Sequence, residues 1–230
     1  GHWDSLITPA SMAGGVRLAD CAWAADGTLL WLEGRGDKSV LVMQPPDSIE
    51  PRDVDTGCDV RARVGYGGGD FSMGGNNIYF SAADSGRMMR QDLQGGHAAA
   101  ITPAFGRAAA PKLSADERWL LFVHSYEGQD CLAIVDAQGT HWPQKLAYGD
   151  DFYMQPAWHP DGSQIAWIAW RHPNMPWDGT CLHLGRLSQN EHALPTLAES
   201  RVIAGGERTA IFQPEFSPDG RYLAYVSDQS

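Results

Sequence analysis

The sequence has 230 residues, 43% of them hydrophobic, with nine tryptophans and a formal net charge of −11 at neutral pH. This composition predicts a folded globular chain with a sizeable core rather than a disordered one. The 17 lysines and arginines are outnumbered and scattered, which argues against the basic stripe that nucleic-acid binding requires. No apolar run is long enough for a membrane-spanning helix. We therefore expect neither a nucleic acid nor a membrane as a partner.

Strand-turn-strand segments recur five times along the chain, with spacings of 48, 41, 46 and 58 residues between turns centred on Gly27, Gly75, Asp116, Gly162 and Gly220. The sharpest copies, 155–170 and 213–226, each place Pro-Asp-Gly between two apolar runs. Proline presets φ entering such a turn and glycine accepts a positive φ, so each copy predicts a β-hairpin. A period in the forties built of strands is typical of propeller blades. We predict an all-β fold: a partial β-propeller of four-stranded antiparallel blades, about four and a half of them.

Further strands follow each hairpin in this interpretation. Blade one is expected over about 18–61, and the later strands of blade two over 86–93 and 99–103. The segment 130–136 is expected to be the third strand of blade three. Residues 7–10 repeat the Ile-Thr-Pro-Ala of 101–104, and are either the tail of an outer strand or an entry segment.

The four cysteines lie far apart and show no C-x-x-C spacing: Cys21, Cys58, Cys131 and Cys181. Each falls on or beside a predicted strand, where an unpaired cysteine usually packs as a small hydrophobe. Unpaired cysteines favour a reduced, cytoplasmic location.

Two connecting segments are candidates for recognition. Three consecutive glycines at 67–69 indicate a close approach of the backbone, either to another chain segment at a crossover or to a ligand, with Arg61, Arg63 or Tyr66 exposed. The largest insertion, 171–180, is rich in turn formers and aromatic residues. It is either a recognition loop or a self-packed connection in which Trp177 plugs the blade edge.

No catalytic or metal-binding residue is identified. The G-x-S-x-G elbow of α/β-hydrolases is absent, and the nearest segment, 69–74, has the wrong spacing. The eight histidines are spread singly, so we expect no metal and no cofactor. His159 is expected to pack within its turn, and His172 with His183 would be too few ligands for zinc. The carboxylate pairs Asp150 with Asp151 and Asp53 with Asp55 are interpreted as turn residues on solvated faces.

Five segments carry a resemblance to a known family: 3–8, 31–35, 60–71, 78–81 and 172–180. They resemble the N-terminal propeller of the prolyl oligopeptidase family, in particular its acylaminoacyl-peptidase and dipeptidyl-aminopeptidase-like branch. In that family a propeller, typically of seven blades, caps a C-terminal α/β-hydrolase domain and restricts the active site to short peptides. Residues 1–230 would then be a truncated N-terminal propeller, with the hydrolase domain outside them. The chain departs from the family pattern at Val64-Gly65, where His-Glu is usual, and at Gly36, where proline is usual.

The resemblance implies a substrate-gating propeller of a serine exopeptidase or oligopeptidase, whose partners are a short peptide and the missing hydrolase domain. The residues expected to face the interdomain cavity are Arg63, Tyr66, Asn174, Trp177 and Asp178. The alternative is a stand-alone TolB-like propeller that binds a protein or peptide at its central channel. In either case an open blade edge at about 215–227 predicts pairing with another copy or a compact alternative closure.

Overall fold

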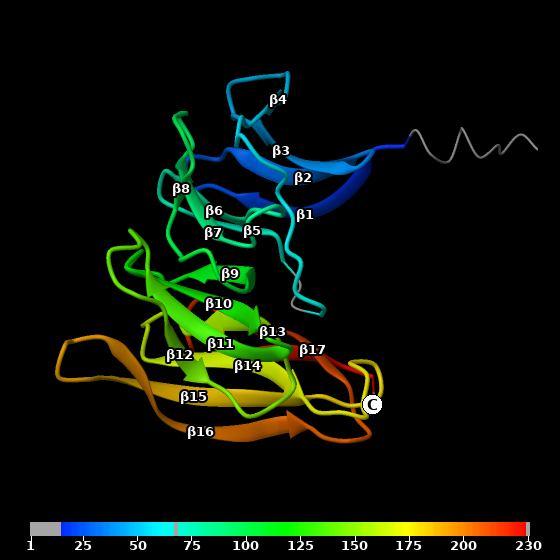
Figure 1. Cartoon of the computed structure of the whole chain (residues 1–230), viewed down its shortest axis with the longest axis vertical. Helices are drawn as coiled ribbons and strands as arrows, with labels where there is room; N and C mark the ends of the chain where they lie inside the picture. The colour runs from blue at the N-terminus through cyan, green and yellow to red at the C-terminus, as the bar shows by residue number, and fades with distance from the viewer. Residues whose placement is uncertain (1–14, 67–68, 229–230) are drawn as a thin grey trace, which may run out of the picture.

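A computed structural model describes residues 15–66 and 69–228. Its strands form five antiparallel sheets that follow one another along the chain (Figure 1). Four sheets have four strands each, the fifth has two, and the described residues contain no helix. The sheets do not close into a ring. The structure confirms the predicted all-β fold of four blades and the first hairpin of a fifth.

The strands of each blade appear in sequence order, as in an up-and-down meander. Blade one contains β1 (Arg17–Trp23), β2 (Leu29–Arg35), β3 (Lys38–Gln44) and β4 (Arg52–Asp53). Blade two contains β5 (Phe71–Gly74), β6 (Asn77–Ser81), β7 (Met88–Asp92) and β8 (Ala99–Ala100). Blade three contains β9 (Arg107–Leu113), β10 (Trp119–Tyr126), β11 (Gln129–Asp136) and β12 (Gln144–Ala147). Blade four contains β13 (Phe152–Trp158), β14 (Gln164–Trp170), β15 (Cys181–Gln189) and β16 (Pro195–Gly205), and blade five begins with β17 (Ile211–Phe216) and β18 (Leu223–Ser227).

The first turn of each sharp repeat is closed as its sequence predicts. Gly162 and Gly220 have φ values of +74° and +70°. The N–H groups of these glycines donate to the carbonyl oxygens of His159 and Ser217 at 2.9 and 2.8 Å. His159 also packs as expected: its ring contacts Phe216 edge-on, and its Nε2 lies 2.9 Å from the carbonyl oxygen of Gly220. The turns of blades four and five are therefore joined to each other.

The core lies between successive sheets rather than at one centre. Each of four buried clusters draws side chains from two neighbouring blades. Trp167 of blade four, for example, is 2% exposed and belongs to one cluster with Leu121 and Leu132 of blade three. Consecutive buried residues along central strands such as β6, β11 and β14 point to opposite faces, so these blades have two apolar faces, and stacking removes both from water.

The innermost strands carry a feature that the sequence did not reveal. Asp20, Ala110, Gln155 and Gln213 have φ between +47° and +54°, and each lies at a register shift between the first two strands of its blade. Such a β-bulge bends the strand and turns its neighbours toward the axis. The side chain of Gln155 uses this geometry, because its Oε1 accepts the N–H of Gln213 at 2.7 Å.

Two predictions about single residues are wrong. Cys21 is exposed rather than packed, because β1 faces the open central cavity of the incomplete ring. Asp53 lies in β4 rather than in a turn, and its carboxylate forms two hydrogen bonds of 2.7 and 2.8 Å with Arg35. All four cysteines lie in the described part of the chain and are unpaired. The segment 7–10 and Gly67-Gly68 lie outside the described residues.

The outer edge of β18 has no neighbouring strand among the described residues. Tyr225 and Val226 on this strand are 45% and 52% exposed. A strand edge with exposed apolar side chains is a template for pairing with another chain.

We predict that residues 1–230 self-associate through this edge. Replacing Val226 with lysine should reduce the association, because a charged side chain opposes edge-to-edge pairing. Sedimentation velocity over a range of concentrations measures the effect. A monomeric wild-type chain whose β18 amides exchange rapidly with solvent would contradict edge pairing.

The hydrogen bond between the Gln155 side chain and the N–H of Gln213 generates a second prediction. Gln155→Ala should lower the free energy of unfolding by about 1 kcal/mol, because it removes one acceptor from the backbone of the next blade. Urea unfolding of the variant and of Gln94→Ala measures this difference; the Gln94 side chain is exposed and forms no hydrogen bond to another blade within the described part of the chain. Equal free energies of unfolding for the two variants would show that the hydrogen bond from Gln213 to Gln155 does not stabilise the fold.

Candidate functional site

The insertion between β14 and β15 is held rigidly at its beginning. Arg171 donates from Nε to Oδ1 of Asp150 at 2.7 Å, and the N–H of His172 donates to Oδ2 of Asp151 at 2.8 Å. The two aspartates lie in the turn before β13, as the sequence interpretation placed them. Asp150 raises the pKa of Arg171, so that guanidinium stays charged. The pair of aspartates therefore anchors the insertion to its own blade.

The middle and end of the insertion are fixed by backbone contacts. Asn174 donates its side-chain amide to the carbonyl oxygen of Glu207 at 2.8 Å, and Asp178 accepts the N–H of Met175 at 3.0 Å. A Cβ on Gly179 would lie 2.4 Å from backbone atoms of Glu207, so only glycine fits there. Thr180 completes the connection, since its hydroxyl bonds both the N–H and the carbonyl oxygen of Ile211 in blade five.

An aromatic cluster lies beside the insertion. Phe152 and Trp170 stack with ring centroids 5.1 Å apart, and Tyr66 meets both rings edge-on at 5.5 and 5.6 Å. Tyr66 comes from the connection between blades one and two, and its hydroxyl donates to Sδ of Met175 at 3.8 Å. Aromatic pairs in this geometry are stabilised beyond the area they bury. Residues 109 positions apart are thus joined at one site.

A cavity of about 530 Å³ opens next to this cluster. Its lining combines an aromatic wall with carboxylate and imidazole groups: Trp170, His172, Asn174, His183 and Glu207. His172 packs edge-on against Phe152, whereas His183 stacks on Trp167, so the two histidines use different aromatic partners. The volume lies within the range of ligand sites, and the lining also contains the charged residues Asp150 and Arg171, so the cavity is more polar than most such sites.

The five residues expected at the site are placed differently from one another. Tyr66, Asn174 and Asp178 all surround Met175, but the side chains of Asn174 and Asp178 are occupied in shaping the loop. Trp177 is 61% exposed, so the alternative in which it plugs the blade edge is wrong. Arg63 is exposed and forms no ion pair or hydrogen bond within the described part of the chain.

Several site residues were missed by sequence reasoning. Phe152 and Trp170 belong to strands whose apolar pattern indicated core alone, Met175 lies within the identified insertion but was not singled out, and Glu207 has no motif around it. The only signal was the density of aromatic residues at the ends of the strands that flank the insertion. The described residues contain no group of three or more histidine, cysteine or acidic side chains suited to a metal ion.

The glycine run has a structural explanation at its last member. Gly69 has a φ of +74°, and a Cβ there would lie 3.3 Å from Cα of Ala110. Its carbonyl oxygen accepts the N–H of Ala110 at 2.9 Å. Gly69 therefore allows a close approach to the inner strand of blade three, the first of the two alternatives that the sequence left open.

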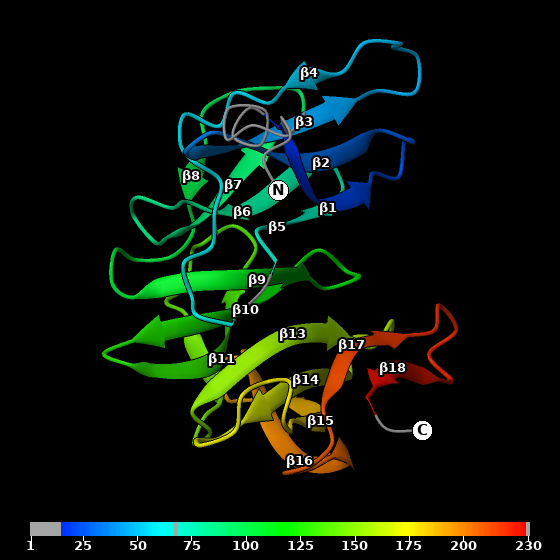
Figure 2. The same ribbon diagram turned by 90° about the vertical axis from the view of Figure 1, so that its right-hand side faces the viewer.

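The inner strands of all five sheets surround a second cavity of about 900 Å³ (Figure 2). Burial raises the pKa of Asp20 and of Asp70, and the charge of Asp20 raises that of Asp70 further. Lys112 and Glu215 also line this central cavity. The cavity is wide and open because the ring of sheets is incomplete, and its lining combines these charged groups with apolar side chains such as Trp23 and Phe71.

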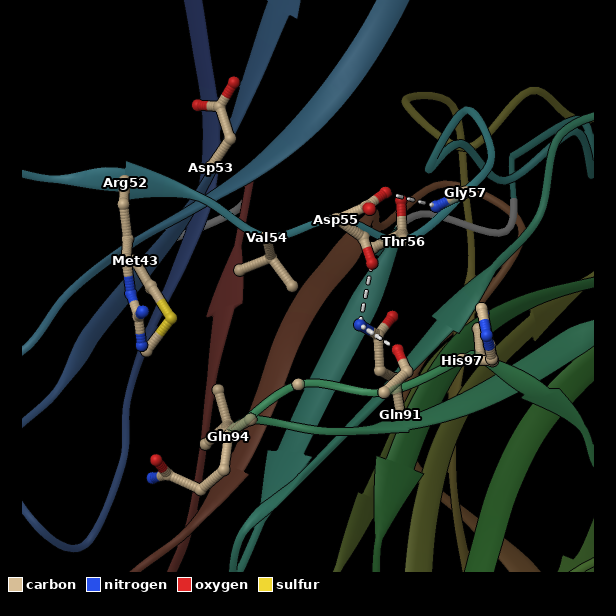
Figure 3. Close-up of a pocket in the computed structure, with 14 residues that line it drawn as sticks. Met43, Arg52, Asp53, Val54, Asp55, Thr56, Gly57, Gln91, Gln94 and His97 are labelled. Carbon is tan, nitrogen blue, oxygen red and sulfur yellow. Dashed lines mark hydrogen bonds between the residues drawn. The ribbon is translucent and has the colours of Figure 1, made fainter.

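Figure 3 shows a third cavity, about 550 Å³, between the outer strands of blades one and two. Gln91 reaches across it from β7, and its amide donates to the carbonyl oxygens of Asp55 and Gly96 at 2.8 and 3.2 Å. These bonds hold the chain after β4 against the β7–β8 loop. We interpret this region as a junction between two short outer strands.

A pH dependence of stability follows from His183. Burial lowers the pKa of His183, with Asp150 opposing and Arg171 reinforcing this shift. The unfolded chain therefore binds a proton at His183 more tightly than the folded chain does. The free energy of unfolding is consequently highest above about pH 6.5 and declines as the pH falls through that value. Allowing for solvent screening, the decline should be less than about 1 kcal/mol per pH unit.

Urea unfolding at several pH values between about 5.5 and 7.5 tests this prediction. His183→Gln should flatten the decline, whereas His97→Gln, on an exposed loop, should leave it unchanged. Identical pH profiles for wild type and His183→Gln would contradict the prediction.

Comparisons with known proteins give one consistent result. No protein-family profile and no curated protein matches the sequence. A puromycin-hydrolysing peptidase of Mycobacterium tuberculosis matches with a TM-score of 0.80 at 24% identity, and a puromycin hydrolase with 0.81 at 27% identity. Each match covers 99% of this chain and 38% of the other.

A putative TolB from Agrobacterium tumefaciens matches less closely, with a TM-score of 0.59 at 19% identity over 90% of this chain and 75% of the other. That likeness shows the fold alone. The chain spans only 38% of the length of the puromycin-hydrolysing enzymes. The similarity to those enzymes extends over nearly all of the present sequence, and it is to the N-terminal propeller of the prolyl oligopeptidase family.

Proposed function

We propose that this chain is the substrate-gating propeller of a serine exopeptidase or oligopeptidase that acts on short peptides. The observation that carries the proposal is the match to puromycin hydrolase, at 27% identity over 99% of the chain. In this proposal the nucleophilic serine, its histidine and its aspartate lie in a hydrolase domain outside residues 1–230. The acylaminoacyl-peptidase and dipeptidyl-peptidase branch, and a cytoplasmic location, are parts of the same proposal.

The cavity beside the insertion supports a role in contacting the peptide. It opens at the blade ends that carry the β14–β15 connection and the loop bearing Tyr66. Its wall is pinned by Asp150, Asn174 and Thr180, so the surface is preorganised rather than formed on binding. Trp177 extends from this rigid loop into solvent, where a large aromatic side chain can meet a partner. Arg63 is exposed and has no ion-pair partner within the described part of the chain, so it is free to meet an anionic group of a peptide.

The central cavity supports the gating part of the proposal. The inner strands of the blades surround an axial space rather than a filled core. In the complete ring that the proposal assumes, such an axial opening would admit an extended chain and exclude a folded protein. The side chains of Lys112 and Glu215 would then line the path of the peptide.

A stand-alone TolB-like propeller is the second candidate. The observation that favours it is the wider coverage of the TolB chain, 75% against 38% for the peptidases. In that case a partner peptide would bind in the central cavity and no serine chemistry would be present.

Labelling with a fluorophosphonate probe separates the two candidates. We expect the full-length product of the gene to be labelled and residues 1–230 alone to remain unlabelled, because the nucleophile lies outside them. Absence of labelling in both would favour the binding propeller. Comparable hydrolysis of a tripeptide and of a folded protein by the full-length product would contradict gating.

The contact surface has its own test in the full-length protein. Trp177→Ala should raise KM for a short peptide substrate about tenfold, since an exposed aromatic anchor contributes 1 to 2 kcal/mol to binding. The rate of fluorophosphonate labelling should not change, because the nucleophile is untouched. The control is Tyr222→Ala, a 68% exposed aromatic side chain beside the first turn of blade five, at the opposite end of the strands. Equal KM values for both variants would remove Trp177 from the site.

A further inference from the structure

A separate cleft lies at the outer rim between blades two and three, away from the insertion. Its volume is about 130 Å³. Thr102 and Pro103 of blade two form one wall, and Phe122 and Ala133 of blade three form the other. The cleft continues the buried cluster that joins these two blades, which also contains Phe122 and Ala133. It is a place where that interblade core is left unfilled.

Small residues create the space. Gly86, Ala108 and Ala133 line the cleft where larger side chains would occupy it. Gly86 and Gly106 also let the segment before β9 lie close to blade three, since a Cβ on Gly106 would lie 2.4 Å from the ring of His124. Ala108 and Ala133 are 2% and 3% exposed, so the floor of the cleft belongs to the fixed part of the fold.

The mouth of the cleft is aromatic. Phe105 stacks on Trp142 with centroids 5.7 Å apart and an interplanar angle of 14°. It also contacts the rings of His124 and Tyr126 edge-on at 5.2 and 5.4 Å. The ring of His124 is oriented by Nε2, which lies 3.2 Å from the carbonyl oxygen of Phe105. Trp142 is 67% exposed although its ring stacks on Phe105. An exposed aromatic surface beside an apolar cleft is a feature of interaction sites.

The charges at the cleft are positive in an otherwise acidic chain. Lys145 lines the cleft, Arg87 donates from Nε to the carbonyl oxygen of Thr102, and Arg107 lies beside Gly86. The ion pairs of the described arginines involve other positions: Arg35, Arg171, Arg186 and Arg221. Lys145 is the one lysine or arginine among the lining residues, and it forms no ion pair within the described part of the chain, whereas Arg87 and Arg107 lie near the cleft without lining it.

From this geometry we propose that the rim cleft binds an aromatic carboxylate, with the ring between the blades and the carboxylate at Lys145. The ring size follows from the volume, since an apolar cavity of about 150 Å³ holds one benzene molecule. The carboxylate follows from Lys145, whose positive charge at the cleft has no ion-pair partner among the described residues. Both a free aromatic acid and a peptide that ends in an aromatic residue present this chemistry. The site shares no residue with the proposed peptide site, so it does not depend on the proposed function.

Ligand-observed NMR titration of the full-length protein tests the proposal with three probes of one shape: 3-phenylpropionate, 3-phenylpropan-1-ol and 3-phenylpropylamine. We expect the carboxylate to bind most tightly and the amine most weakly. Trp142→Ala should abolish the binding of the carboxylate, and Lys145→Gln should weaken it about threefold while leaving the alcohol unchanged, as expected for an exposed ion pair. Both side chains are exposed, so neither change should unfold the protein.

Two control variants test whether the probes bind in the rim cleft. Ala133→Leu, which fills the floor, should block all three probes, whereas Trp177→Ala at the insertion should leave their affinities unchanged. Unchanged affinity in Trp142→Ala, or an amine that binds as tightly as the carboxylate, would overturn the proposal. The dipeptide Gly-Phe and its C-terminal amide distinguish the sources: binding of Gly-Phe alone indicates a peptide terminus, and binding of neither restricts the ligand to free aromatic acids.

Discussion

Face-to-face packing of successive sheets is the interaction on which the rest of this structure depends. Each buried cluster is shared by two neighbouring blades, so no blade has a core of its own. A single four-stranded sheet would leave both apolar faces in water, and the hydrophobic effect therefore stabilises the stack rather than the separate blades. The packed sheets fix the positions of the loops at the blade ends, from which the candidate peptide site is built, and of the strands that form the floor of the rim cleft.

The inner strands show how the stack turns into an arc around a central space. A bulge with a left-handed residue recurs in blades one, three, four and five, and Gly69 has the corresponding backbone conformation at the entrance to blade two. Adopting a positive φ costs energy for residues such as Ala110, and the neighbouring sheets must supply the compensation. The Gln155 side chain contributes, because it satisfies a backbone N–H that the bulge of the next blade exposes. The same bulges leave the axis lined by polar groups rather than filled.

Two surfaces with opposite characters result. The insertion in blade four is held by carboxylates, with Asp150 and Asp151 at its start and Asp178 within it. The rim cleft between blades two and three has Lys145 at its mouth and no carboxylate among its lining residues. Both surfaces carry an exposed tryptophan, Trp177 at the insertion and Trp142 at the cleft.

Much of the fold could be predicted, whereas the sites could be predicted only in part. Tyr66 and the insertion were identified from glycine density and turn residues, but their meeting at Met175 was not. Phe152 and Trp170 could not be recognised as site residues from the sequence. An apolar strand residue at the edge of a core shows the same sequence pattern as an apolar residue at the centre of that core. Cys21 was misplaced for the same reason, since the pattern of β1 does not say that its inner face borders open space.

The sequence by itself determined the hairpins, their order and their assembly into four-stranded blades. Those features depend on local rules: Pro-Asp-Gly turns, alternation with a period of two, and a repeat length in the forties. Only the tertiary structure decided the left-handed bulges, the contact of Tyr66 with Met175, and the unfilled cleft beneath Trp142. Each of these arises from how one sheet is placed against the next, and that placement is a compromise among many side chains that no short segment contains.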